Sequence, residues 1–306
     1  MFTGHKRQKE TLAKAIISGN VSHAFIFEGA SGLGKKTLAL YLFEMINCRE
    51  KKEEKPCGHC RECLGIRKGN HPDLILVDPG RKEIQINQIR DIIYKTSLSP
   101  YSAPYKWIII NDAHLMNKEA SNSLLKVLEE PKGNAIFFLI SEYPEMLPET
   151  VRSRTQRIKF FPLKEKKIVS LLEKIGCPAE NAHKIASFSF GRPGVALNFF
   201  KKDKKLEMRR EKIKELAEIT SPQKPFYLRF KYAENFSKDP EALKETLEIW
   251  LSYLRGLLLE KIGGGKVKYS FDKIKTSLES IEKTIHLINK TSVNPKLAAE
   301  VLLMDL

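Results

Sequence analysis

The chain has 306 residues and a formal net charge of +16, because 53 lysines and arginines outnumber 37 aspartates and glutamates. Its length predicts two or three domains, and its apolar content of 42% is enough for a sizeable core. The longest apolar runs have the length of core strands, well short of the roughly 18 residues that a membrane span needs. Since the first residues (MFTGHKRQKE) contain no apolar signal region, we expect a cytoplasmic protein with no membrane partner.

Short apolar runs alternate with amphipathic stretches through the first 160 residues. The predicted strands are 23–27, 74–77, 107–110, 136–140 and 156–160, and the predicted helices are 5–18, 37–47, 86–98 and 118–130. This alternation is typical of a parallel sheet with helices on both faces, so the first part of the chain is predicted to have an α/β fold.

The pattern changes after Pro162, where only helical periodicity remains. The predicted helices are 164–175, 179–188, 195–200, 206–219, 243–261, 271–289 and 295–303. The stretch from 205 to the end predicts four or five packed helices. We therefore expect three domains, an α/β core at 1–161, a small helical domain at 162–204 and an all-α domain at 205–306.

A glycine-rich loop (GASGLGKKT) stands between a predicted strand and helix, where a phosphate-binding loop belongs. The candidate nucleotide-binding residues are Gly29, Gly32, Gly34, Lys35, Lys36 and Thr37. The glycines let backbone N–H groups turn toward an anion, and Lys35 is placed to reach the terminal phosphates. The pattern next requires a Ser or Thr that binds Mg²⁺, but Lys36 stands there, and Thr37 is rotated about 100° further round the helix. A glycine-rich turn that binds no nucleotide remains an alternative.

The third predicted strand ends in Asn111 and Asp112, two further candidate residues of the nucleotide site. In nucleotide hydrolases of this class, a strand of this kind ends in carboxylates that hold Mg²⁺ and activate water. Asn111 offers a neutral amide instead of an Asp, and Asp112 is one methylene shorter than the expected Glu. These departures argue against ATP hydrolysis, but they leave binding of ATP or ADP open, because affinity and catalysis use different groups. His114 is interpreted as a packing residue.

Four cysteines fall within one window with the spacing C-x8-C-x2-C-x2-C: Cys48, Cys57, Cys60 and Cys63. Four thiolates complete a tetrahedral zinc shell, and the x2 spacing lets successive ligands curl around one ion. Two disulfides and an iron–sulfur cluster remain alternatives, the first disfavoured in a cytosolic chain. Because all four positions are filled by protein, we expect a structural Zn²⁺ site.

Ser153 and Arg154 follow the fourth predicted strand, in the segment TVRSRTQR. An arginine at the edge of a nucleotide-binding core can stabilise charge on the γ-phosphate of a neighbouring subunit. From the residues alone, a solvated basic surface is the alternative.

Together these segments resemble the clamp-loader AAA+ family of bacterial DNA polymerase III. The resemblance covers nearly all of residues 1–200, and 205–306 match only in length and helical character. It rests on HAFIFEGASGLGKKT, CREKKEEKPCGHCREC, IQINQIRDIIYKTSLSPY, KWIIINDAHLMNKEASNSLLKVLEEP, TVRSRTQR and GRPGVAL. It implies an AAA+ RecA-like parallel-sheet core with a zinc module inserted at 48–63, a helical lid domain at 162–204 and a helical collar (oligomerisation) domain at 205–306.

The same resemblance implies roles for individual residues. Ser153 and Arg154 fall on the family's Ser-Arg-Cys motif, whose arginine acts in trans on the ATP of the adjacent motor subunit, and Thr155 replaces the cysteine. The family's sensor-2 arginine aligns with Gly194, and Arg192 is not an evident substitute. The resemblance therefore implies a non-motor (stator) subunit of the sliding-clamp loader, which is part of the polymerase holoenzyme and not an enzyme on its own. Its implied partners are the gamma/tau motor and delta subunits and, through the assembly, the sliding clamp and primed DNA.

Two other functions remain open. An active motor ATPase of the gamma/tau type, or another AAA+ ATPase, would need the missing Ser or Thr after Lys35. A free-standing zinc module that binds DNA would need a helix with clustered base-reading residues, and none is evident. The net charge is +10 for residues 1–200 and +6 for 201–306. Such a diffuse excess is typical of long-range steering within an assembly.

Overall fold

The computed structural model describes residues 4–50, 55–79, 82–130, 133–201, 203–221, 227–237, 239–262, 264–265, 267–290 and 293–306. The chain forms two compact units, Met1–Leu171 with Gly191–Val195, and Leu172–Phe190 with Ala196–Leu306. The division passes through the predicted lid segment at 162–204, so the three-domain division stays a prediction.

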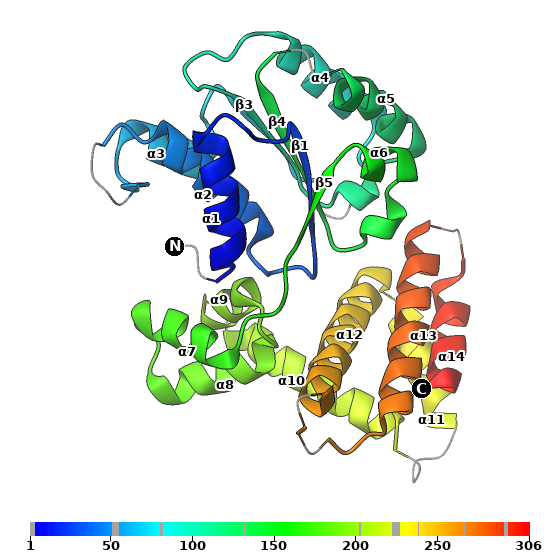
Figure 1. The fold of residues 1–306 in the computed structure, drawn as a ribbon. Helices are drawn as coiled ribbons and strands as arrows, with labels where there is room; N and C mark the ends of the chain where they lie inside the picture. Colours follow the sequence, from blue (N-terminus) through cyan, green and yellow to red (C-terminus); the bar gives the residue numbers. More distant parts are fainter. Residues whose placement is uncertain are drawn as a thin grey trace. The chain divides into compact units, whose positions relative to one another are not determined.

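The first unit is built on a parallel sheet with the strand order β2-β3-β4-β1-β5 (Figure 1). Its strands are β1 (Ala24–Glu28), β2 (Leu74–Val77), β3 (Lys106–Ile110), β4 (Ala135–Ser141) and β5 (Gln156–Lys159). All five predicted strands are confirmed, each end to within one residue. They were predictable because most of them are apolar on both faces, as strands between two helical layers must be.

Helices cover both faces of this sheet. They are α1 (Lys6–Ile17), α2 (Lys35–Asn47), α3 (Arg61–Lys68), α4 (Ile86–Ser97), α5 (Lys118–Glu129) and α6 (Glu149–Ser153), with short 3-10 turns η1 (Ala113–Leu115) and η2 (Pro144–Met146). Alternate residues of β1 pack against the helices on opposite faces of the sheet. Phe25 and Phe27 pack in the core beside α1 and α2, whereas Ala24 and Ile26 pack in the core beside α4 and α5.

Helix α2 begins earlier than predicted, at Lys35 rather than Thr37. Gly34 has a φ of 89°, a left-handed conformation that glycine adopts readily, and it turns the chain directly into the helix. Both loop lysines therefore belong to the first helical turn, and their side chains leave the loop in different directions. Helix α3 was not predicted, because it is short and lies within the cysteine segment.

Helices α7 (Glu165–Lys174) and α9 (Pro193–Lys201) have residues in both units, and α8 (Ala179–Ser189) belongs to the second unit. The remaining helices are α10 (Asp203–Ile219), α11 (Tyr227–Ser237), α12 (Pro240–Ile262), α13 (Phe271–Lys290) and α14 (Pro295–Asp305). From 203 onward the described residues contain helices and no strand, as predicted. Trp250 is buried in the apolar core of this unit, and its indole N–H donates to the Lys212 carbonyl at 2.8 Å.

None of the described helices is both long and apolar enough to cross a bilayer.

Candidate functional sites

The glycine-rich loop connects β1 to α2 at the carboxyl ends of the parallel strands, where α/β proteins bind ligands. Gly29, Gly32 and Gly34 all have positive φ, between 81° and 133°. Gly29 also leaves no room for a side chain, because a Cβ there would lie 2.6 Å from the Phe160 carbonyl oxygen. The backbone of this loop therefore requires the glycines that the sequence provides.

Lys35 turns back onto its own loop. Its ammonium donates to the carbonyl oxygens of Gly29 and, at 2.8 Å, of Ala30. The residue is only 6% exposed, and burial lowers its pKa to about 8, against the opposing effect of Glu142 and Asp112. The Lys35 ammonium thus stabilises the loop backbone directly.

Lys36 extends to a different partner. Its Nζ lies 2.6 Å from Oδ2 of Asp78, the residue that follows β2. The Asn111 amide donates to Asp78 Oδ1 at 3.3 Å and to Asp112 Oδ2 at 3.0 Å. Burial and then Asp78 raise the pKa of Asp112, and Lys35 and Lys36 oppose them. The structure thus brings together three of the predicted residues, Lys36, Asn111 and Asp112, whereas Thr37 is exposed.

Asp78 was not predicted as part of this site. A signal was present, since an acidic residue directly follows an apolar strand (LILVD) just as Asn111 and Asp112 follow β3. The missing information was the strand order, because only adjacency of β2 and β3 brings their carboxyl ends together.

His114 lies beside this network and has a packing role, as predicted. Its Nδ1 is 3.2 Å from the Ser141 hydroxyl, and its ring packs edge-on against Tyr143. Burial, followed by Lys35, lowers the pKa of His114 to about 4, so the ring is neutral at pH 7.

Two distant segments hold the loop from outside. The Gly194 N–H at the start of α9 donates to the Gly32 carbonyl at 2.8 Å, and His5 Nε2 lies 3.2 Å from the Leu33 carbonyl oxygen. A Cβ on Gly194 would lie 3.1 Å from both Cα and O of Gly32. The position that resembles sensor 2 therefore packs backbone against backbone, and a side chain at Gly194 would push against the loop by a few tenths of an ångström.

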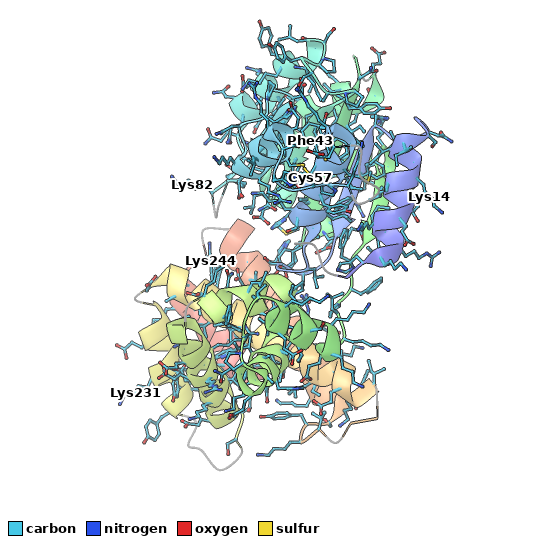
Figure 2. All side chains as sticks on the ribbon, turned by 90° about the vertical axis from the view of Figure 1, so that its left-hand side faces the viewer. Lys14, Phe43, Cys57, Lys82, Lys231 and Lys244 are labelled. Atoms are coloured by element: carbon cyan, nitrogen blue, oxygen red, sulfur yellow. The ribbon has the colours of Figure 1, made fainter. Side chains whose placement is uncertain are left out.

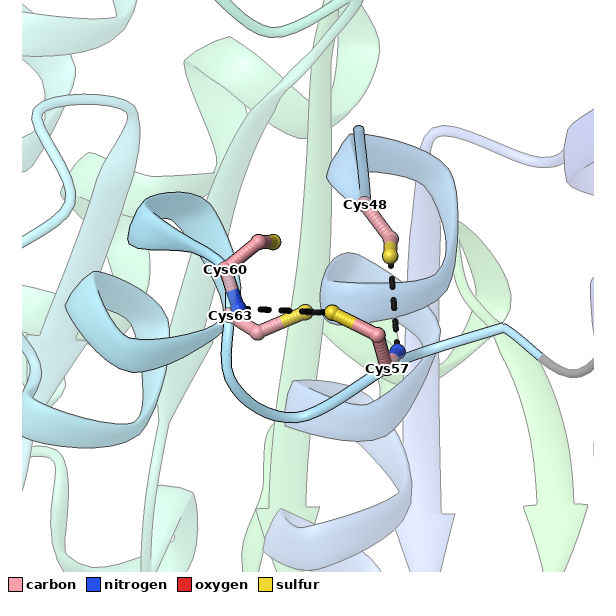
Figure 3. A group of neighbouring side chains, drawn as sticks. All are labelled: Cys48, Cys57, Cys60 and Cys63. Carbon is pink, nitrogen blue, oxygen red and sulfur yellow. Dashed lines mark hydrogen bonds between the residues drawn. The ribbon is translucent and has the colours of Figure 1, made fainter. Parts of the chain in front are cut away.

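The four clustered cysteines converge from α2, the following loop and the start of α3 (Figure 3). Their sulfurs all lie within 4.8 Å of one another, and Cys57 and Cys63 are 4.0 Å apart. A zinc–sulfur distance of about 2.3 Å implies a sulfur–sulfur edge of about 3.8 Å in a tetrahedron, so the set fits one metal ion with only small shifts.

Backbone N–H groups point at these sulfurs. Cys57 N lies 3.4 Å from Cys48 Sγ, and Cys60 N lies 3.3 Å from Cys57 Sγ. Burial by itself would raise the pKa of Cys60, but N–H groups of Cys63 and Arg49 lower it to about 6. These contacts favour the thiolate form of Cys60, whereas burial raises the pKa of the Cys63 thiol, which a bound metal ion would have to deprotonate.

The cysteine module is anchored on the core by contacts between ionisable side chains. Arg67 of α3 contacts Glu44 of α2 with two nitrogens, at 3.0 Å from Nε and 2.9 Å from Nη2. Glu62 lies 2.6 Å from Arg49 and 3.2 Å from the buried His71. Because Arg–carboxylate pairs of this kind fix orientation, α3 is held in one position on α2.

Arg154 follows α6, beside the end of α5. Its Nη1 donates to the Thr150 carbonyl at 3.0 Å, and its Nη2 lies 2.8 Å from Oε1 of Glu129. The side chain is 37% exposed, and Ser153 shares the Thr150 carbonyl at 3.1 Å. The guanidinium is therefore at the surface and only loosely held, since an exposed ion pair contributes at most about 1 kcal/mol.

Comparison with known proteins places this chain in a family. The family model described as DNA polymerase III, delta subunit, matches residues 4–164. The delta-prime subunit of Bacillus subtilis DNA polymerase III is 33% identical over 289 residues, which cover 91% of this chain and 86% of the relative. The chain belongs to the DNA polymerase III delta-prime family.

Relatives named tau or gamma match a shorter stretch of this chain. The tau subunit of B. subtilis is 35% identical over 172 residues, which cover 56% of this chain and 30% of tau. A solved structure of a gamma subunit-related protein from Thermotoga maritima superposes with a TM-score of 0.51 over 97% of both chains, at 21% identity. This likeness confirms the predicted fold, a parallel-sheet core followed by a helical region. Membership of the delta-prime family identifies the chain as a clamp-loader subunit of DNA polymerase III.

Proposed function

We propose that this delta-prime family member is a non-motor (stator) subunit, which presents Arg154 to ATP bound by a neighbouring motor subunit. The observation that carries the proposal is the half-exposed Ser153–Arg154 pair on a core whose own loop has Lys36 at the metal position. An arginine offered in trans stabilises the charge that develops on the transferred phosphoryl group. A phosphate can replace Glu129, because the present pair is exposed and weak.

The proposed partners follow from this role. They are the gamma/tau motor and delta subunits, with the sliding clamp and primed DNA reached through the assembly in the cytoplasm. The helices from 205 to 306 would form the collar that joins the subunits. Zn²⁺ would be held by the four clustered cysteines as a structural ion, because four thiolates leave no open position for a substrate.

The test is a loader reconstituted with motor and delta subunits. Arg154→Ala is expected to lower turnover by about 10³-fold at the one ATP site that it serves, and to slow clamp loading onto primed DNA. Arg154→Lys is also expected to fail, because an ammonium lacks the planar fork of the guanidinium. Arg7→Ala, which removes an exposed arginine of α1, is the control. Unchanged DNA-stimulated turnover with Arg154→Ala contradicts the role in trans.

The similarity to tau favours one alternative, an active motor ATPase. It predicts ATP turnover by the isolated chain that Lys35→Ala abolishes. On the proposed function the isolated chain has no such turnover.

A further inference from the structure

The ion pair between Lys36 and Asp78 lies where three elements of the first unit meet. Lys36 is in the first turn of α2, Asp78 directly follows β2, and Asn111 and Asp112 directly follow β3. The contacts form one chain, 2.6 Å from Lys36 to Asp78, 3.3 Å from Asp78 to Asn111 and 3.0 Å from Asn111 to Asp112. Lys36 thereby supplies a positive charge to a pair of carboxylates.

Lys36, Asp78, Asn111 and Asp112 occupy the positions that surround Mg²⁺ in the phosphate loop of an active nucleotide hydrolase. There, the residue after the loop lysine gives a hydroxyl, and strand-end carboxylates bind the ion directly or through water. Here the residue in the hydroxyl position brings its own charge instead. A divalent ion beside Asp78 would stand a few ångströms from the ammonium, and this repulsion opposes binding.

Asn111 adds a second obstacle. Its amide NH₂ donates to both Asp78 and Asp112, so an N–H donor faces the carboxylates where a metal needs an oxygen. The donor set therefore does not fit Mg²⁺, although Asp78 and Asp112 alone would suit it.

We propose that Lys36 is a built-in cation that takes the place of the divalent metal, paired with Asp78 and linked through Asn111 to Asp112. The loop then has no Mg²⁺ site, with or without nucleotide. This inference rests on the proposed non-motor function and gives a physical reason why the loop would not support ATP hydrolysis. It does not depend on the role of Arg154.

The test uses the full-length, zinc-loaded chain with Mn²⁺ as a spectroscopic substitute for Mg²⁺, titrated by electron paramagnetic resonance with and without ADP. The wild-type chain is expected to show no saturable Mn²⁺ binding at the loop. Lys36→Thr removes the ammonium and restores the hydroxyl. In the presence of ADP, we expect this variant to bind one Mn²⁺ at least tenfold more tightly than the wild-type chain does. Adding Asp78→Asn to Lys36→Thr is expected to abolish this gain.

The matched control is Lys95→Thr, because Lys95 forms a comparable pair with Asp91 on α4, at 2.7 Å, away from the loop. It is expected to gain no Mn²⁺ site. Lys36→Gln keeps the side-chain length and removes the charge, so it should also gain Mn²⁺ binding, but more weakly. This variant replaces Lys36→Thr in the test if Lys36→Thr does not fold.

Wild-type binding of Mn²⁺ as tight as that of Lys36→Thr overturns the inference. The inference is also overturned if no folded Lys36 variant gains Mn²⁺ binding, or if the Mn²⁺ binding gained by Lys36→Thr persists when Asp78→Asn is added. Because these measurements use the isolated chain and the Arg154 test uses the reconstituted loader, the two proposals can fail separately.

Discussion

At the scale of single residues, one buried carboxylate organises the connection that leads into β3. Asp73 is 1% exposed and accepts backbone N–H groups from Tyr101 at 2.6 Å, Ser102 at 2.8 Å and Ala103 at 2.9 Å. These three N–H groups are not part of the sheet. The Asp73 carboxylate satisfies them, as a capping side chain satisfies the free N–H groups at the start of a helix.

Replacing this carboxylate should therefore be costly. Asp73→Asn keeps the shape but removes the charge that strengthens three hydrogen bonds, and we expect a loss of about 2–3 kcal/mol in the free energy of unfolding. Urea unfolding measures it. Asp91→Asn, which breaks an exposed pair with Lys95, should cost less than about 1 kcal/mol. Equal effects of the two substitutions would contradict this account.

The same carboxylate predicts a pH dependence. Burial alone would raise the pKa of Asp73, but the three N–H donors outweigh it and hold the pKa below its ordinary value of 3.8. Since the folded-state pKa is depressed, its stabilisation is complete above pH 4 and is lost as the pH falls through the folded-state value. The stability difference between wild type and Asp73→Asn should therefore narrow below pH 4, and a constant difference would refute the assignment.

At the scale of secondary-structure elements, the cysteine module is a short helix held by the four-cysteine cluster at one end and by Arg67 and Glu44 along its side. Helix α3 has only eight residues, too few to be stable on its own. Its order must therefore depend on the cluster and on packing against α2.

Removal of the metal tests this dependence. A chelator, or Cys60→Ser, is expected to release about one zinc per chain and to increase amide hydrogen exchange at 61–68 while leaving the strands protected. Zinc content and hydrogen-exchange mass spectrometry measure the two effects. Cys177→Ser is the control, because Cys177 lies outside the cluster. Full protection of 61–68 in the metal-free chain would show that packing alone suffices.

At the scale of the whole molecule, the chain has two compact units, each with its own apolar core. Each unit contains one of the two tryptophans, Trp107 in the sheet and Trp250 in the helical unit. The basic residues are spread over both units. Figure 2 marks Lys14 and Lys82 in the first and Lys231 and Lys244 in the second, on four different segments. This spread agrees with steering within an assembly better than with one concentrated DNA site.

The two tryptophans make the units separately observable. In Trp250→Phe the remaining fluorescence reports the first unit, and in Trp107→Phe it reports the second. Because separate cores can unfold separately, we expect different urea midpoints for the two signals, and a wild-type curve that is not a single two-state transition. Each substitution should also destabilise mainly its own unit. Superimposable curves at every urea concentration would contradict independent cores.

The sequence by itself determined the elements and the kinds of site. Most of the strands are apolar because both faces of a parallel sheet are buried. The loop needs glycines because its backbone has positive φ, and the cysteine spacing is short enough for one ion. These features depend on residues close together in the chain, so local patterns reveal them.

Only the tertiary structure decided how these sites are completed. Asp78 pairs with Lys36 because β2 lies beside β3, Gly194 packs on Gly32 because the start of α9 meets the loop, and Glu129 holds Arg154 because α5 ends beside α6. Each partner comes from a distant part of the chain and has no spacing rule that would identify it. Strand order and helix packing bring such residues together. Both are set by burial of apolar surface over the whole unit, which no local sequence pattern reveals.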